Sequence, residues 1–237
     1  AINKKLYMIL EDLTFEQDFF NNNNSIKKGD VDLIKGSALN ELSNFPNNKF
    51  QCLITSPPYC NRYDYTRTYA LELALLNTSE EELKDMRQKM LTCTVENRKK
   101  SLDNISISTN EAEKSFERHG LLQAILANLT YKKQSKKLNN NGIPRMVEGY
   151  FRELSHVIFE SYRILDNEAY MIMVNDNVRY TGITIPVDLI LSDFAKKAGF
   201  EIEKIWVLPV GKGNSSQQMG KHGREQLRKC VYVWKKL

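Results

Sequence analysis

The sequence predicts an α/β fold, a single open sheet with helices packed on it and a helical insertion within it. Its length of 237 residues and hydrophobic content of 41% suffice for one sizeable core, which favours one domain over two. Runs typical of buried strands alternate with helical spacing in the last third of the chain. Residues 60–145 are polar, charged and helix-forming instead. We therefore expect residues 1–59 and 146–237 to form the domain and residues 60–145 to form the insertion.

Short apolar runs predict the strands, at residues 31–35, 50–55, 169–174, 202–208 and 230–234. Apolar residues at helical spacing predict a helix over residues 147–165 and another with its apolar face over residues 187–198, with Pro186 in its first turn and Gly199 as its C-terminal cap. No helix separates the last two strands, so they should pair antiparallel as a C-terminal hairpin. The first thirty residues are polar, and the run Asn21-Asn22-Asn23-Asn24 within them is expected to be a loop or a frayed entry.

Within the insertion, two matches to the Ser-x-x-Glu capping box predict helix starts at Ser79 and at Ser108. Residues 132–142 are predicted to be an exposed basic loop that closes the insertion.

The charge distribution suggests a polyanionic partner. The net charge is +5, and residues 204–237 hold eight Lys/Arg against Glu225 alone, a local balance of +7 that leaves the remainder slightly acidic. Such a patch attracts phosphates, although a solvated surface explains it equally well. No apolar run is long enough to cross a bilayer and the start lacks a signal peptide, so we expect a cytoplasmic protein. The four cysteines lie far apart, so neither a metal site nor disulfides are expected.

The segment Thr55-Ser56-Pro57-Pro58-Tyr59 ends a predicted buried strand, where open α/β sheets bind their ligands. The Ser56 hydroxyl and the main-chain carbonyl of Pro57 could both accept hydrogen bonds from an exocyclic amine. Two such acceptors would turn the nitrogen lone pair toward an electrophilic methyl group. Tyr59 could stack on the ring, and the prolines fix the backbone in advance. On the residues alone, a rigid turn without chemistry is about as good an explanation.

This segment resembles the catalytic motif, Ser/Asn/Asp-Pro-Pro-Tyr/Phe, of the DNA methyltransferases that modify exocyclic amino groups of cytosine or adenine. Residues 60–69 and 213–219 also look like segments of restriction-modification methyltransferases, so the resemblance covers most of the chain. It implies a Rossmann-like class I methyltransferase sheet, S-adenosylmethionine as methyl donor and double-stranded DNA from which the target base is flipped out. A serine at the start of the motif favours cytosine over adenine. The resemblance assigns catalysis to Ser56, Pro57, Pro58 and Tyr59, and donor contacts to Ser37, Thr55 and Ser56.

The sequence departs from the family where the methyl donor binds. It lacks the glycine-rich Phe-x-Gly-x-Gly turn, and its closest match, Gly211-Lys212-Gly213, follows a late strand and is typical of a flexible loop. The expected elements correspond to the later half of a seven-strand sheet. We therefore expect a catalytic half whose donor-binding half lies on another chain or on a missing segment.

Cations and aromatic residues interleave just after the motif, a composition that suits phosphate contact and base stacking. The candidate DNA contacts are Arg62, Tyr63, Arg67, Lys212, Lys221 and Arg224. Tyr65 and Tyr69 could equally be core residues of a helix. Residues 71–145 form either a target-recognition region or a structural cap, and residues 175–177 are either polar pocket lining or a capped turn.

Cys60 is interpreted as non-nucleophilic, because enzymes that methylate carbon 5 of cytosine carry their cysteine directly after proline and Tyr59 intervenes here. His119, His156 and His222 show no ligand spacing and are expected to be structural or surface residues. Two other functions stay open. One is a DNA-recognition subunit without catalysis, and the other is a methyltransferase acting on RNA or on protein amines.

Overall fold

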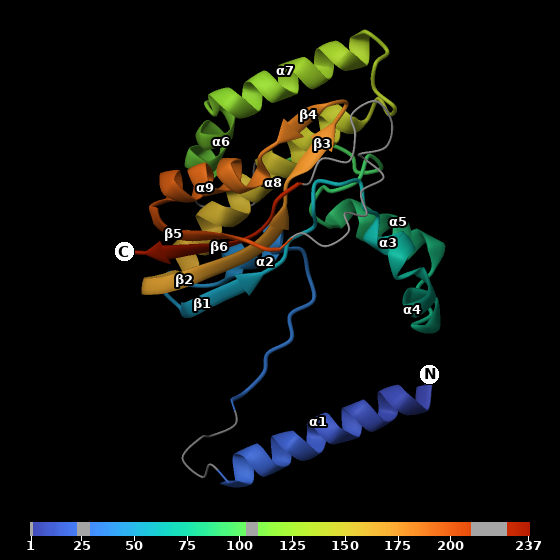
Figure 1. The fold of residues 1–237 in the computed structure, drawn as a ribbon, viewed down its shortest axis with the longest axis vertical. Coiled ribbons are helices and arrows are strands. Elements are labelled where there is room, and N and C mark those ends of the chain that lie inside the picture. Colours follow the sequence, from blue (N-terminus) through green and yellow to red (C-terminus); the bar gives the residue numbers. More distant parts are fainter. Residues whose placement is uncertain (1, 23–28, 103–108, 210–226) are drawn as a thin grey trace. The chain divides into compact units, whose positions relative to one another are not determined.

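The computed structural model describes residues 2–22, 29–102, 109–209 and 227–237 (Figure 1). The chain divides into two units, Ala1–Lys35 and Gly36–Leu237. None of the helices in the described residues is long and apolar enough to cross a membrane.

The first unit contains helix α1 (Ile2–Asn22), which the sequence did not predict; it ends within the asparagine run, of which Asn23 and Asn24 lie outside the described residues. Apolar residues at spacings of four and three, Ile2, Leu6, Ile9 and Leu13, give this helix one apolar stripe. The strand predicted at residues 31–35 was wrong, because that stretch has no regular secondary structure, pairs with no strand in the described residues, and leaves Leu33 94% exposed. A strand needs a neighbour to hydrogen-bond with, which an apolar run alone does not supply.

The second unit is built on a four-stranded sheet with the order β1-β2-β6-β5. Its strands are β1 (Phe50–Thr55), β2 (Leu165–Asp176), β5 (Phe200–Val207) and β6 (Lys229–Lys236). β1 and β2 run parallel, with Thr55 opposite Met173, and β6 lies antiparallel to both β2 and β5. The α/β class and the antiparallel pairing of the last two strands are confirmed.

Two long helices, α8 (Ile143–Ile164) and α9 (Val187–Ala198), cover one face of this sheet (Figure 1). The inner stripe of α8, which includes Tyr150, Leu154 and Ile158, is buried against the sheet. The predicted cap at Gly199 is confirmed, with a left-handed φ of 116° that suits glycine, whereas Pro186, predicted in the first turn of α9, is its N-cap.

The other face of the sheet is poorly covered. Its side chains are exposed or half-buried apart from Val233, with Ile54 73% and Trp206 54% exposed. β1 lies at the edge of the sheet, and none of the described residues pairs with its outer side. Within the described part of the chain, the sheet therefore ends at the strand that leads into the Ser-Pro-Pro-Tyr segment.

The regular elements described between β1 and α8 are all helices: α3 (Tyr65–Thr68), α4 (Ala70–Leu75), α5 (Glu80–Lys89), α6 (Thr109–Glu117) and α7 (Gly120–Gln134). The capping box at Ser79 and Glu82 is confirmed, whereas Ser108 lies outside the described residues. The basic loop predicted from residue 132 begins only at Ser135, because α7 continues to Gln134.

Small elements that the sequence did not reveal complete the fold. α2 (Ala38–Glu41) and the 3-10 turn η1 (Leu42–Asn44) pack against α8, and β3 (Val178–Tyr180) pairs with β4 (Ile183–Ile185) as a separate hairpin.

Candidate functional site

The Ser-Pro-Pro-Tyr turn follows the carboxyl end of β1 directly. Ser56 is exposed, Pro57 is buried, and Pro58 and Tyr59 are half-buried. The side chain of Tyr59 folds back so that its hydroxyl lies 3.3 Å from the Ser56 hydroxyl. The turn thus presents the serine oxygen to solvent while a buried proline holds the backbone behind it.

Hydrogen bonds fix the chain just after the turn. Tyr180, in β3, donates a hydrogen bond of 2.6 Å from its hydroxyl to the carbonyl of Cys60. Cys60 itself is fully buried, and burial, followed by the nearby Cys93, raises the pKa of its thiol well above the usual value. A thiol that stays protonated is a poor nucleophile, which agrees with the non-nucleophilic interpretation of Cys60.

The end of β2 lies beside the end of β1, and its polar residues have distinct partners. Asn175 is buried and donates to the Tyr150 hydroxyl at 2.7 Å. Asn177 accepts a hydrogen bond from the amide of Asp188, in the first turn of α9, at 3.0 Å. These two asparagines stabilise the fold. Asp176 between them is different, because its Oδ1 atom is buried and has no hydrogen-bond partner among the described residues.

β6 adds a cation that the sequence did not identify as a site residue. Lys229 pairs with Asp176 across the sheet, and its Nζ atom lies 6.0 Å from the centre of the Tyr59 ring. That distance is at the limit of a cation–π contact. Only the register between β6 and β2, strands distant in the sequence, brings Lys229 here.

The predicted DNA contacts in the described residues lie on the segment that follows the turn. Tyr63 is 47% exposed and packs edge-on against Tyr65 with ring centres 5.1 Å apart. Arg62 has a φ of 65°, and its guanidinium donates a long hydrogen bond of 3.5 Å to the side-chain oxygen of Asn139. The Arg67 side chain is 71% exposed, and Asp64 lies 3.3 Å from it. Lys212, Lys221 and Arg224 lie outside the described residues.

Asp64 organises this segment by capping α3. It accepts hydrogen bonds from the Thr66 amide at 3.0 Å and the Thr66 hydroxyl at 2.6 Å, and Arg87 approaches it to 3.0 Å. Partial burial raises the pKa of the Asp64 carboxyl, but the hydrogen bonds and the Arg87 charge outweigh it and lower the pKa overall. Asp64 is therefore an ionised anchor that fixes the backbone between the turn and Arg67.

The predicted donor contacts come from two places in the fold. Thr55 is the half-buried last residue of β1, adjacent to Ser56. Ser37 precedes α2, and its buried hydroxyl neither caps that helix nor has a hydrogen-bond partner in the part of the chain that the structure describes.

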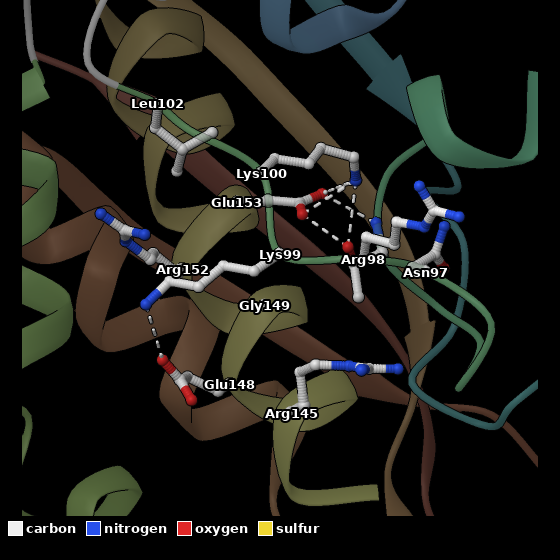
Figure 2. Close-up of a pocket in the computed structure, with 11 residues that line it drawn as sticks. Asn97, Arg98, Lys99, Lys100, Leu102, Arg145, Glu148, Gly149, Arg152 and Glu153 are labelled. Carbon is white, nitrogen blue, oxygen red and sulfur yellow. Dashed lines mark hydrogen bonds and ion pairs between the residues drawn. The ribbon is translucent and has the colours of Figure 1, made fainter. Parts of the chain in front are cut away.

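A separate pocket lies between residues 92–102 and the first half of α8 (Figure 2). At its floor the Lys100 Nζ atom lies 2.9 Å from both carboxylate oxygens of Glu153, which also accept from the Thr92 amide and hydroxyl. Lys100 is 16% and Glu153 4% exposed. This buried pair fastens the loop to α8, and the cations around it include Arg98, Lys99 and Arg145.

The described histidines have structural partners. His119 accepts a hydrogen bond from the Leu122 amide and so caps α7, and His156 is buried 3.3 Å from Glu113. His222 lies outside the described residues.

The chain is similar in sequence to Type II methyltransferases. Over 239 residues, covering the whole chain, it is 53% identical to the Type II methyltransferase M.AvaI of Nostoc sp. (strain PCC 7120) and equally to that of Anabaena variabilis. Its homologues are Type II methyltransferases. M.BsoBI of Geobacillus stearothermophilus is a third, 45% identical over 213 residues that cover 86% of this chain. No protein-family model matches the chain.

The chain spans about half the length of these relatives, 48% of M.AvaI and 42% of M.BsoBI. Among solved structures, TTHA0409 of Thermus thermophilus matches 85% of this chain and 50% of its own at 13% identity, with a TM-score of 0.37. That likeness is too low to define a function.

Proposed function

We propose that this chain is the catalytic half of a site-specific DNA methyltransferase, which transfers a methyl group to the exocyclic amine of a flipped base, cytosine in preference to adenine. The observation that carries the proposal is the 53% identity with Type II methyltransferases over the whole chain, a region that includes the turn at Ser56. The exposed serine at the end of a sheet strand has the position that such chemistry needs.

In this proposal the turn holds the amine and directs its lone pair. The Ser56 hydroxyl and the Pro57 carbonyl accept its two protons, and the ring stacks on Tyr59. The 3.3 Å contact between the Ser56 and Tyr59 hydroxyls is long for a hydrogen bond between hydroxyls, so the incoming amine can replace it at low cost. Because Pro57 is buried and the carbonyl of Cys60 is tied to Tyr180, the acceptors keep their positions during the reaction.

S-adenosylmethionine would supply the electrophilic methyl group, but this chain does not by itself provide a complete site for it. The sequence lacks the glycine-rich turn. In the described residues the sheet ends at β1, whose Ile54 is 73% exposed, and further strands of a methyltransferase sheet would continue from there. Ser37 and Thr55 remain candidate contacts at that border. We propose that the part of the relatives that this chain does not match contributes the donor site.

The proposed DNA contacts are the cations and aromatic residues beside the turn. Arg62 and Tyr63 are the best placed, because Tyr63 is exposed and the hydrogen bond that Arg62 makes to Asn139 within the described residues is long, at 3.5 Å. Arg67 would have to share its charge with Asp64. Lys212, Lys221 and Arg224 remain proposed DNA contacts because they belong to the basic C-terminal region of the sequence.

The test is a tritiated-methyl transfer assay on duplex DNA, first with this chain alone and then with the part of M.AvaI that this chain does not match added as a second chain. We expect transfer only in the mixture, with Ser56→Ala losing most of it and Cys60→Ala keeping it. Sequencing of the methylated bases then identifies cytosine or adenine. The opposite ranking of the two variants would overturn the mechanism, and tight S-adenosylmethionine binding by this chain alone in titration calorimetry would overturn the division into halves.

A second candidate is a DNA-recognition subunit without catalysis. The absence of the glycine-rich turn favours it, whereas the intact Ser-Pro-Pro-Tyr turn favours catalysis. Binding of duplex DNA without transfer in any reconstituted mixture would select this second function.

A further inference from the structure

The pocket between residues 92–102 and α8 is lined by more positive than negative charge (Figure 2). Five cations and two carboxylates line it: Arg98, Lys99, Lys100, Arg145, Arg152, Glu148 and Glu153. A cleft lined mainly by one sign of charge raises the local concentration of ions of the opposite sign. The composition of this pocket therefore favours an anion as its ligand.

Two of these cations are neutralised within the fold. Lys100 lies 2.9 Å from Glu153, and Arg152 lies 2.8 Å from Glu113. Both cations are mostly buried, with 16% of the Lys100 side chain and 20% of the Arg152 side chain exposed. These pairs fasten the walls of the pocket to each other, and they leave little charge to attract a ligand.

Arg98 and Arg145 are different, because no carboxylate in the described residues forms an ion pair with either guanidinium, and both residues are exposed. Arg145 donates a hydrogen bond of 2.8 Å to the Val95 carbonyl, which holds its side chain against the loop without neutralising it. Lys99 adds a third exposed cation, and its contact with Glu148 is loose at 3.8 Å and screened by water. The charge available to a ligand is therefore that of Arg98 and Arg145, with Lys99 beside them.

The size of the pocket limits the kind of anion that fits. Its volume is about 20 Å³, which is room for roughly one water-sized group. A nucleobase or a whole nucleotide is too large to enter. One oxygen of a phosphodiester group can enter while the rest of the strand stays outside, and a guanidinium group suits it because its planar fork matches two phosphate oxygens.

The loop that carries Arg98 also supports the segment that follows the Ser-Pro-Pro-Tyr turn. The Cys93 thiol donates a hydrogen bond of 3.3 Å to the carbonyl of Tyr63, one of the proposed DNA contacts. Asn97 accepts hydrogen bonds of 3.1 Å from the amides of Cys93 and Thr94, which folds the loop back on itself just before Arg98. Each strand of a duplex carries a phosphate about every 3.4 Å along the axis, so DNA bound beside the turn can also reach the pocket.

We propose that this pocket binds a backbone phosphate of duplex DNA, with Arg98 and Arg145 holding one phosphodiester group and Lys99 beside it. The inference rests on the proposed function for its partner, duplex DNA, and assigns a DNA contact to the insertion. A phosphate contact fixes the position of the duplex and carries no sequence information. The pocket therefore anchors the DNA while the turn at Ser56 receives the base.

The experiment measures binding of the full chain to two unrelated DNA duplexes of equal length by fluorescence anisotropy over a range of salt concentrations. We expect Arg98→Gln/Arg145→Gln to raise the Kd about tenfold or more on both duplexes. The slope of the logarithm of the binding constant against that of the salt concentration should become shallower by about 0.9 for one lost phosphate contact. The matched control Arg118→Gln/Lys196→Gln removes two exposed charges that do not line the pocket, and its Kd should stay within about twofold of that of the unmodified chain.

A local measurement tests where the DNA lies. Bound duplex should shield Lys99 from an amine-modifying reagent, followed by mass spectrometry, while the exposed Lys196 keeps its reactivity. Thermal unfolding separates binding from folding. Because the Arg98 guanidinium makes no ion pair in the described residues, Arg98→Gln alone should leave the unfolding temperature unchanged and still weaken DNA binding.

The inference is wrong if the pocket variant and the control weaken binding equally, if Lys99 reacts equally with and without bound DNA, or if the unmodified chain does not bind duplex DNA. The methyl-transfer assay decides the proposed function separately in each of these cases. If the chain binds DNA through the pocket but no reconstituted mixture transfers a methyl group, the proposed catalysis fails while the phosphate site stands.

Discussion

Replacing Lys100 by methionine tests whether the buried pair with Glu153 holds residues 92–102 on α8. Methionine keeps the apolar stem of the lysine but removes the charge that lies 2.9 Å from both carboxylate oxygens. The carboxylate, 4% exposed, would keep only the Thr92 amide at 2.8 Å and the Thr92 hydroxyl at 2.5 Å. Breaking a buried pair on one side typically costs about 3–5 kcal/mol. Since the Thr92 hydrogen bonds remain, we expect a loss of about 2–4 kcal/mol.

Urea unfolding followed by circular dichroism measures this loss, and a decrease of about 3 kcal/mol corresponds to an unfolding temperature about 6–12 °C lower in a chain of this size. The matched control is Lys114→Met, which removes the exposed partner of Glu111 and should change stability by less than about 0.5 kcal/mol. The double variant Lys100→Met/Glu153→Gln should lose about 1–3 kcal/mol less than the sum of the single variants. Additive losses, or a Lys100→Met protein as stable as the control, would show that the pair does not hold the loop.

Three further outcomes follow from the packing and the titrating groups. Gly199→Ala should lower the free energy of unfolding by about 1–3 kcal/mol, measured by thermal unfolding, because φ is 116° and the new Cβ would lie 2.6 Å from Tyr162. The control Gly120→Ala, whose Cβ meets nothing within 4 Å, should change that free energy by less than about 0.5 kcal/mol. Titration of the native protein with a disulfide reagent should detect one fast thiol, the exposed Cys52, and Cys52→Ser should remove it; a second fast thiol would contradict the burial of the other three. Burial lowers the pKa of His156, so the unfolded chain binds a proton at this histidine more readily than the folded chain does. As the pH falls below about 6.5, the free energy of unfolding should therefore decrease by up to about 1.4 kcal/mol per pH unit, and His156→Gln should remove this pH dependence.

The sequence predicts the elements of this fold well where strong local signals coincide. α9 is the clearest case, since Pro186 and Gly199 bracket an apolar face of the right period, and the structure places the helix at Val187–Ala198. The strand before the Ser-Pro-Pro-Tyr turn is found with its correct bounds because two prolines end it. In these places propensity, period and capping agree.

Predictions fail where the deciding interaction lies far away in the chain. Residues 31–35 have the composition of a strand, but no described strand accepts them as a neighbour and Leu33 is 94% exposed. Conversely, α1 was missed because its polar composition and the asparagines that end it outweighed a regular stripe of apolar residues. A single sequence gives the local pattern but not the partner that makes one conformation stable.

In the candidate site, too, the sequence reveals the residues of a local motif but not those that distant strands bring to it. The turn at Ser56 could be identified because its chemistry is contained in five consecutive residues. Lys229 could not, because its position over Tyr59 depends on the register of β6 against β2, and that register is set by side chains packed along both strands. Asp176 was recognised as polar, but only the structure shows that it alone among residues 175–177 has an unused acceptor.

The same register explains why the turn can be both rigid and open. Pro57 is buried, Tyr180 holds the carbonyl of Cys60, and β1 is fixed to β2, so the backbone of the turn is held on each side. The outer edge of β1 has no such support in the described residues, and the Ser56 side chain is exposed at the end of that strand. In the proposed function, Ser56 at this border would meet a base held by this chain and a methyl donor held by another segment, so the proposal accounts for both the unpaired edge of β1 in the described residues and the exposed Ser56.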